Sequence, residues 1–168
     1  MENYIMLNGK KIPLTEEQIK LIQEDVPEKS PFDRADEGET YYYIDYAFEV
    51  HDDEDWRSDS DDDCYRCANY CTDENIMKQH TLHMILNNLL WRYSMTHGGG
   101  KMSFERSTAR KYCIGYDDYN KAFYPHGSQF IKFLGTVYFI DANTARAAIE
   151  EIVKPFIEAH PEFDLTKM

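Results

Sequence analysis

One acidic stretch limits the fold of this chain more than any other feature of its sequence. Fourteen of the 31 carboxylates lie between Asp33 and Asp63, where only Arg34 and Arg57 offset them. The stretch carries about −12 of the formal net charge of −13, and the other 17 acids (31 less 14) and 16 bases (18 less 2) nearly cancel. Because neighbouring carboxylates repel, we do not expect the run from His51 to Asp63 to pair stably as a strand. The stretch is predicted to be either a solvated loop or a surface that meets a basic partner.

The rest of the chain has the composition of a folded protein. A length of 168 residues is enough for one domain with its own core, and we predict a single domain over residues 1–168. The sequence has no basic and then apolar leader and no long apolar run, which predicts a soluble, cytoplasmic protein with reduced cysteines. The net negative charge disfavours direct binding to nucleic acid or to anionic membranes.

Local sequence patterns predict an α+β fold. The pair Asn8-Gly9 between two short apolar segments predicts a hairpin, and Thr15 predicts the cap of a short helix, so residues 1–26 should form a hairpin plus a helix. Two strand-strand-helix units are expected to follow, over residues 41–100 with an acidic insertion and over residues 110–160. Their helices should pack on an antiparallel sheet.

The helix boundaries are the most strongly marked features of the two units. In the first unit, apolar residues recur at helical spacing, Thr72 or Asp73 can begin the helix, and three glycines from Gly98 end it. In the second unit, Asp141 should cap the helix, and Pro155 should loosen its last turns. The strands of the two units are expected near residues 41–46, 65–71, 111–116, 121–124 and 135–140.

The two units also repeat a short pattern. The segment Asn69 to Ile76 aligns with Val137 to Thr144 at a shift of 68 residues and shares Tyr, Asp and Asn in register. An internal duplication and a convergent use of the same capping chemistry both account for this pattern.

Six short segments, spread in order over most of the chain, carry a resemblance to known proteins. They are Asn8 to Lys10, Leu14 to Ile19, Tyr42 to Asp45, Ala68 to Asp73, Leu89 to Tyr93 and Gly135 to Phe139. Together they resemble a family of small, uncharacterised acidic proteins encoded in phages and prophages of Firmicutes. The resemblance implies a phage-encoded accessory protein in the cytoplasm of the bacterial host, and it carries over no catalytic residue. By analogy with small acidic phage proteins that inhibit host defence, such as anti-CRISPR proteins and DNA mimics, it makes an anti-defence role the leading expectation.

The expected function is therefore non-catalytic inhibition of a host defence protein, such as a CRISPR nuclease. The acidic face would occupy a basic nucleic-acid-binding groove, although its charges, at most one per about 3.5 Å, are half as dense as those of duplex DNA. The residues expected to contact the partner are Asp52, Asp53, Glu54, Asp55, Trp56, Asp59, Asp61, Asp62 and Asp63. Trp56 would either anchor the interface or fold back onto the core. The alternative is a zinc-stabilised or structural phage accessory protein whose acidic segment is a solvated loop.

A zinc site is the main alternative to a protein without a cofactor. Cys64 and Cys67, followed after twelve residues by His80 and His83, approach the spacing of a zinc finger. The two histidines are closer in sequence than that motif requires, and ordinary strand cysteines and half-exposed helix histidines account for the same residues. We predict no cofactor.

The remaining motifs do not predict catalysis or a calcium loop. The carboxylates from Asp59 to Asp63 begin like an EF-hand, but Cys64 stands where that loop needs Gly and Tyr70 where it needs Glu. No local signature pairs a cysteine with a histidine, and the three glycines from Gly98 follow a helix, whereas a phosphate-binding loop follows a strand. The sequence therefore predicts a protein that is not an enzyme.

Overall fold

The computed structural model describes residues 4–7, 9–25, 29–103, 109–128 and 131–165, and it confirms the predicted α+β class. The strands form three separate two-stranded antiparallel sheets. The strands are β1 (Tyr4–Leu7), β2 (Lys10–Pro13), β3 (Thr40–Ile44), β4 (Val50–Glu54), β5 (Lys111–Asp117) and β6 (Ala122–Ser128). The helices are α1 (Glu16–Asp25), α2 (Asp59–Arg66), α3 (Glu74–Thr96), η1 (Gly99–Lys101), α4 (Ala142–Ala148), η2 (Ile149–Val153) and α5 (Lys154–Ala159).

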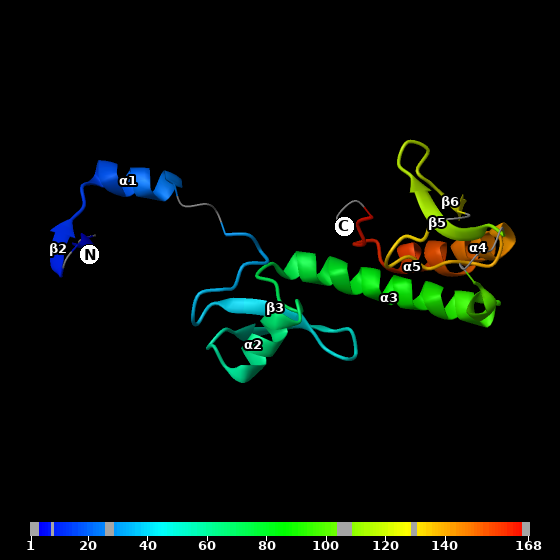
Figure 1. Cartoon of the computed structure of the whole chain (residues 1–168), viewed down its shortest axis with the longest axis horizontal. Coiled ribbons are helices and arrows are strands. Elements are labelled where there is room, and N and C mark those ends of the chain that lie inside the picture. The colour runs from blue at the N-terminus through cyan, green and yellow to red at the C-terminus, as the bar shows by residue number, and fades with distance from the viewer. Residues whose placement is uncertain (1–3, 8, 26–28, 104–108, 129–130, 166–168) are drawn as a thin grey trace.

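The N-terminal hairpin and helix form as predicted. Strands β1 and β2 pair around Gly9, whose φ of +77° is the positive value that the tight turn requires; the predicted turn residue Asn8 lies outside the described residues. Thr15 and Gln18 cap α1 reciprocally, since each main-chain N–H donates to the side-chain oxygen of the other at 3.0 and 3.3 Å. In Figure 1 this blue segment is drawn well apart from the remaining elements.

We call the first observed unit, which contains β3, β4, α2 and α3, the first hairpin–helix unit. Its β3–β4 hairpin lies between the two helices. On one face Tyr41 and Tyr43 pack with Cys64 of α2, and on the other Ile44 packs with Met77 of α3. The long α3 begins after Asp73, one of the two residues predicted to begin it, whose carboxylate accepts the N–H groups of residues 75 and 76. Figure 1 shows α2 and β3 grouped at the start of α3.

Two predictions, one within the acidic stretch and one just after it, were wrong. Its residues do pair, since Asp52, Asp53 and Glu54 form β4 opposite the tyrosine-rich β3. The pairing is tolerated because β4 has a strand on one side only, so its carboxylates reach water. The segment predicted as the strand 65–71 begins inside α2, because Ser58 and Asp61 form a capping box that starts a helix there.

The second hairpin–helix unit contains β5, β6, α4, η2 and α5, and it lies further along α3. Strands β5 and β6 pair over seven residues, and Asp141 caps α4 as predicted by accepting the N–H of Thr144 at 2.8 Å. The predicted loosening before Pro155 takes the form of a π-helical segment, Ile149–Val153, between α4 and α5. Phe156 of α5 then packs in one cluster with apolar residues of α3.

The last strand predicted before the helix of each unit, 65–71 and 135–140, is reduced to one bridge. Cys71 pairs with Tyr42 of β3, and Phe139 pairs with Tyr112 of β5, both antiparallel. Each bridging residue lies two positions before the helix cap, so the chain turns into a helix before a longer strand can form. The repeated sequence pattern therefore corresponds to a repeated local structure.

Candidate acidic binding surface

Seven of the nine residues predicted to contact a partner have exposed side chains. They lie on β4, on α2 and at the connection between these elements. We call this set the acidic surface: Asp52, Asp53, Glu54, Trp56, Asp59, Asp62 and Asp63. Whether a partner binds there remains a prediction, but the set is held by elements that are themselves hydrogen-bonded and capped.

Asp55 does not belong to this surface, because the fold buries it completely. Its side chain is 0% exposed and accepts two hydrogen bonds from the guanidinium of Arg34, from Nε at 2.8 Å and from Nη2 at 3.0 Å. The Tyr70 hydroxyl donates to the same carboxylate at 2.9 Å, and Arg57 contributes its N–H at 3.0 Å. A buried carboxylate needs such partners to stay charged. Through the bond to Arg34, Asp55 links two segments that are 21 residues apart in the sequence.

Asp61 is the second predicted contact residue that the fold buries, at 2% exposure. Its carboxylate accepts the Tyr41 hydroxyl at 3.0 Å and the N–H groups of Trp56 and Ser58 at 3.0 and 2.9 Å. These bonds fix the turn between β4 and α2. Asp61 therefore positions the acidic surface without being part of it.

The pKa values in this region reflect the two buried networks. The Arg34 hydrogen bond, against the opposing effect of burial, lowers the pKa of Asp55 to about 2. For Asp61, burial acts to raise the pKa, but the hydrogen bonds from Ser58 and Tyr41 outweigh it and the net shift is downward. Burial raises the pKa of Tyr70 to about 12. Burial also raises the pKa of Tyr41. The carboxylates of Asp55 and Asp61 are therefore ionised at neutral pH, and the hydroxyls of Tyr41 and Tyr70 remain donors.

The burial of Asp55 changes the charge balance of the surface around it. Arg34 and Arg57, the two bases of the acidic stretch, both pair with this carboxylate, and only Arg34 reaches a surface residue as well, Asp62 at 2.6 Å. Arg66 of α2 pairs with Asp63. Within the described residues, Asp52, Asp53 and Asp59 have no ion pair. The sequence could have suggested that Arg34 and Arg57 pair with a buried acid, because they are the only two bases among the 14 acids of the stretch.

Trp56 does not fold back onto the core. Its side chain is 61% exposed, its ring rests against Gly38, and its indole N–H donates to Glu54 at 3.1 Å. Gly38 has a φ of +83°, and a Cβ at that position would lie 3.1 Å from the ring, so glycine suits both the turn and the aromatic contact. An exposed indole held in one orientation among carboxylates has the geometry of an interface anchor.

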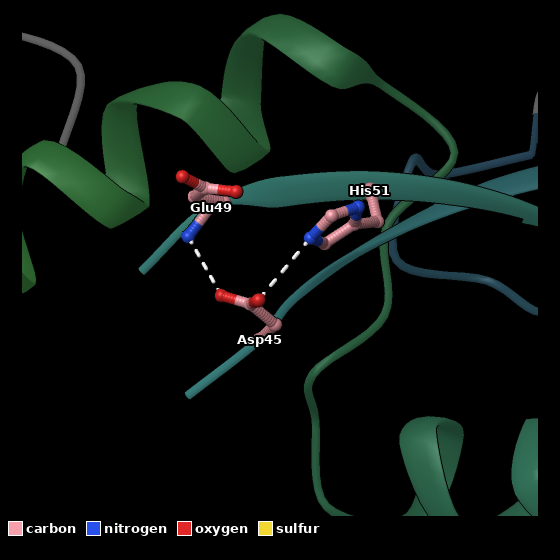
Figure 2. A group of neighbouring side chains, drawn as sticks. All are labelled: Asp45, Glu49 and His51. Carbon is pink, nitrogen blue, oxygen red and sulfur yellow. Dashed lines mark hydrogen bonds and ion pairs between the residues drawn. The ribbon is translucent and has the colours of Figure 1, made fainter. Parts of the chain in front are cut away.

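The described residues contain one group of three side chains with the composition of a metal site, at the turn between β3 and β4. The ligand atoms of Asp45, Glu49 and His51 lie within 4.8 Å of one another (Figure 2). One oxygen of Asp45 already accepts the N–H groups of Ala47 and Glu49, at 2.8 and 2.9 Å, and the other lies 3.2 Å from Nε2 of His51. The Glu49 N–H bond is the main cause that lowers the pKa of Asp45. These contacts explain the convergence as part of the turn.

The four residues of the alternative zinc site are not brought together among the described residues. Cys64 packs beside Tyr41 on the α2 side of the hairpin, whereas His83 lies on α3 with its ring 4.5 Å from that of Phe163. The carboxylates from Asp59 to Asp63 lie in α2, so they do not form a calcium-binding loop.

The roles of Arg34, Tyr41 and Tyr70 in the two buried networks were not predicted, because each depends on a partner distant in the sequence.

No helix in the described parts of the chain has both the length and the apolar character needed to cross a membrane.

Comparisons with protein-family models, with curated proteins and with solved structures find no match to this chain.

Proposed function

We propose that this chain is a non-catalytic binding protein whose acidic surface occupies the basic nucleic-acid-binding groove of another protein. The supporting observation is the separation of roles among the carboxylates. Asp55 and Asp61 are buried, Asp55 pairs with both local bases, and the neighbours of these two acids on β4 and α2 are exposed. Such a surface attracts a basic groove at long range, and an ordered scaffold lowers the entropy cost of binding.

The class of partner follows from the sequence resemblance. Small acidic proteins of phages suggest a bacterial defence protein that binds nucleic acid, such as a CRISPR nuclease, and in this role the chain acts in the host cytoplasm as an inhibitor. Exposed carboxylates would speed association, and Trp56 would slow release by filling a pocket between basic side chains. No cofactor is needed for this mechanism.

The test is affinity capture from a Firmicutes lysate, followed by competition with duplex DNA. The wild-type chain should retain a partner at about 0.05 M salt and release most of it at about 0.5 M, because screening shortens the reach of exposed charges. Duplex DNA should displace the same partner, since both ligands would occupy one groove. A captured protein that binds DNA and this chain at once would contradict the proposal.

Two triple variants with equal net charge provide the control. The first reverses Asp52, Asp53 and Asp59 to lysine on the acidic surface. The second reverses the exposed residues Glu16, Glu17 and Glu158 to lysine elsewhere. Capture should be lost in the first variant and retained in the second, because local charge and not net charge would direct binding. Equal capture by both variants would rule out the acidic surface as the contact.

A further inference from the structure

The turn between β3 and β4 directs two carboxylates and one imidazole toward a common point (Figure 2). Asp45 and Glu49 lie in the turn, and His51 follows on β4. Because their ligand atoms lie within 4.8 Å of one another, some point is within about 2.8 Å (4.8 Å divided by √3) of all three. Zinc binds carboxylate oxygens and imidazole nitrogens at about 2.0–2.2 Å. Side-chain movements of less than about 1 Å would therefore bring all three atoms to one ion.

The contact between Asp45 and His51 already has the spacing of two ligands on one ion. Oδ2 of Asp45 lies 3.2 Å from Nε2 of His51. Two ligands at about 2.1 Å from a tetrahedral ion are about 3.4 Å apart. Since an ionised carboxylate can only accept a hydrogen bond, Nε2 carries the proton of this contact. A metal ion would take the place of that one proton between the same two atoms.

The turn fixes the Asp45 carboxylate for this role. Its Oδ1 accepts the N–H groups of Ala47 and Glu49, so Oδ2 is left to face His51. The Glu49 N–H bond is also the main cause that lowers the pKa of Asp45, and the carboxylate is therefore charged at neutral pH. Hydrogen bonds to the far side of a ligand are the usual way in which a protein orients it toward a metal.

The imidazole is oriented from the opposite strand. His51 pairs with Tyr43 of β3, and the two rings lie 5.7 Å apart between centroids at an angle of 32°. The His51 side chain is 42% exposed, so the ring can exchange protons with water and bind through Nε2 as the neutral tautomer. The ring is thus held in direction and remains accessible to an ion from solvent.

We propose that Asp45, Glu49 and His51 bind one divalent transition-metal ion of the zinc type. The ligands are Oδ2 of Asp45, a carboxylate oxygen of Glu49 and Nε2 of His51. The nitrogen ligand favours such an ion over Mg²⁺ and Ca²⁺, which prefer oxygen alone, and two carboxylates balance its charge. The bound ion joins the turn to β4. None of the three ligands belongs to the acidic surface, so this site is independent of the function proposed for that surface.

Metal titrations of the intact wild-type chain test the proposal. Calorimetry should show saturable binding of Zn²⁺ and much weaker binding of Mg²⁺. The ¹⁵N resonance of His51 Nε2 should shift with Zn²⁺, because the ion replaces the proton on that nitrogen. Zn²⁺ binding that leaves this resonance unchanged would place the ion elsewhere and overturn the proposal. Equal affinity for Mg²⁺ would also overturn it, because exposed carboxylates alone would then account for the binding.

Variants then locate the ion. His51→Phe keeps a ring beside Tyr43 and removes the nitrogen, and Glu49→Gln keeps the size of the side chain and removes its charge. Each should weaken Zn²⁺ binding at least about tenfold, since changes even to groups behind a ligand cost about 10- to 100-fold. The matched controls His126→Phe and Glu158→Gln, at exposed positions elsewhere, should leave the affinity unchanged. Wild-type affinity in His51→Phe, or an equal loss in His126→Phe, would refute the site.

Discussion

In both hairpin–helix units, a tyrosine of the first strand exchanges two backbone hydrogen bonds with a buried residue just before the helix. Tyr42 pairs in this way with Cys71 at 2.7 and 3.0 Å, and Tyr112 pairs with Phe139 at 3.0 and 2.6 Å. The units differ in the second strand, because β4 contains three consecutive acids and β6 contains none. Since the second unit reaches the same arrangement without them, the architecture does not require the carboxylates of β4.

The difference extends to what each unit needs for stability. The first unit has a buried charged network around Asp55, whereas the buried cluster of the second unit packs Phe139 with the alanines of α4. Buried charges are costly unless they are fully paired, so the first unit should be the more sensitive of the two to loss of one group or to acid.

The largest effect should come from Asp55→Ala, which removes the centre of the network. The change leaves the Tyr70 hydroxyl and the Arg34 guanidinium without their shared acceptor, and we expect the free energy of unfolding to fall by about 3 kcal/mol. Urea unfolding monitored by circular dichroism measures this. Asp53→Ala, at an exposed position on β4 two residues before Asp55, is the matched control and should change stability little. Similar losses in both variants would show that the buried network has no special role.

Acid should separate the wild type and Asp55→Ala by a smaller amount. The pKa of Asp55 falls from 3.8 to about 2 on folding, so its contribution is present above pH 4 and is lost as the pH falls toward 2. The wild type should therefore lose on the order of 2 kcal/mol more stability than Asp55→Ala over this range. Unfolding titrations at several pH values provide the comparison. Parallel pH profiles for the two proteins would contradict the assignment.

The smallest effect tests the similarity of the units. Asp73 and Asp141 cap equivalent helices, the first through two main-chain N–H groups and the second through one. Replacing either with alanine should cost about 1 kcal/mol in urea unfolding, with Asp73→Ala slightly the larger. If one replacement cost more than about 2 kcal/mol and the other nothing, the two caps would not be equivalent.

The features that the sequence predicted correctly depend on neighbours in the chain. A cap such as Asp73 or Asp141 bonds to groups two or three residues away, and Pro155 perturbs only the turn before it. The hairpin around Gly9 also depends on a few adjacent residues. Such local chemistry can be recognised without knowledge of the rest of the fold.

The features that were predicted wrongly or missed depend on distant partners. Asp55 looks like any other acid in the stretch until Arg34, 21 residues earlier, is placed beside it. The strand β4 forms because β3 opposes it, despite a composition that disfavours pairing. Composition therefore located the candidate surface, but not which of its acids are buried.

Each hairpin also leaves one strand edge open, and each protects that edge from pairing with another copy of the chain by different chemistry. Within the described residues, the outer edges of β4 and β6 pair with no further strand. Pro125 interrupts the edge of β6 because it has no N–H to donate, while Asp52, Asp53 and Glu54 line β4 with negative charge. The charges of β4 therefore oppose self-association, and replacing them with neutral side chains would remove this protection from the first unit while leaving that of the second intact.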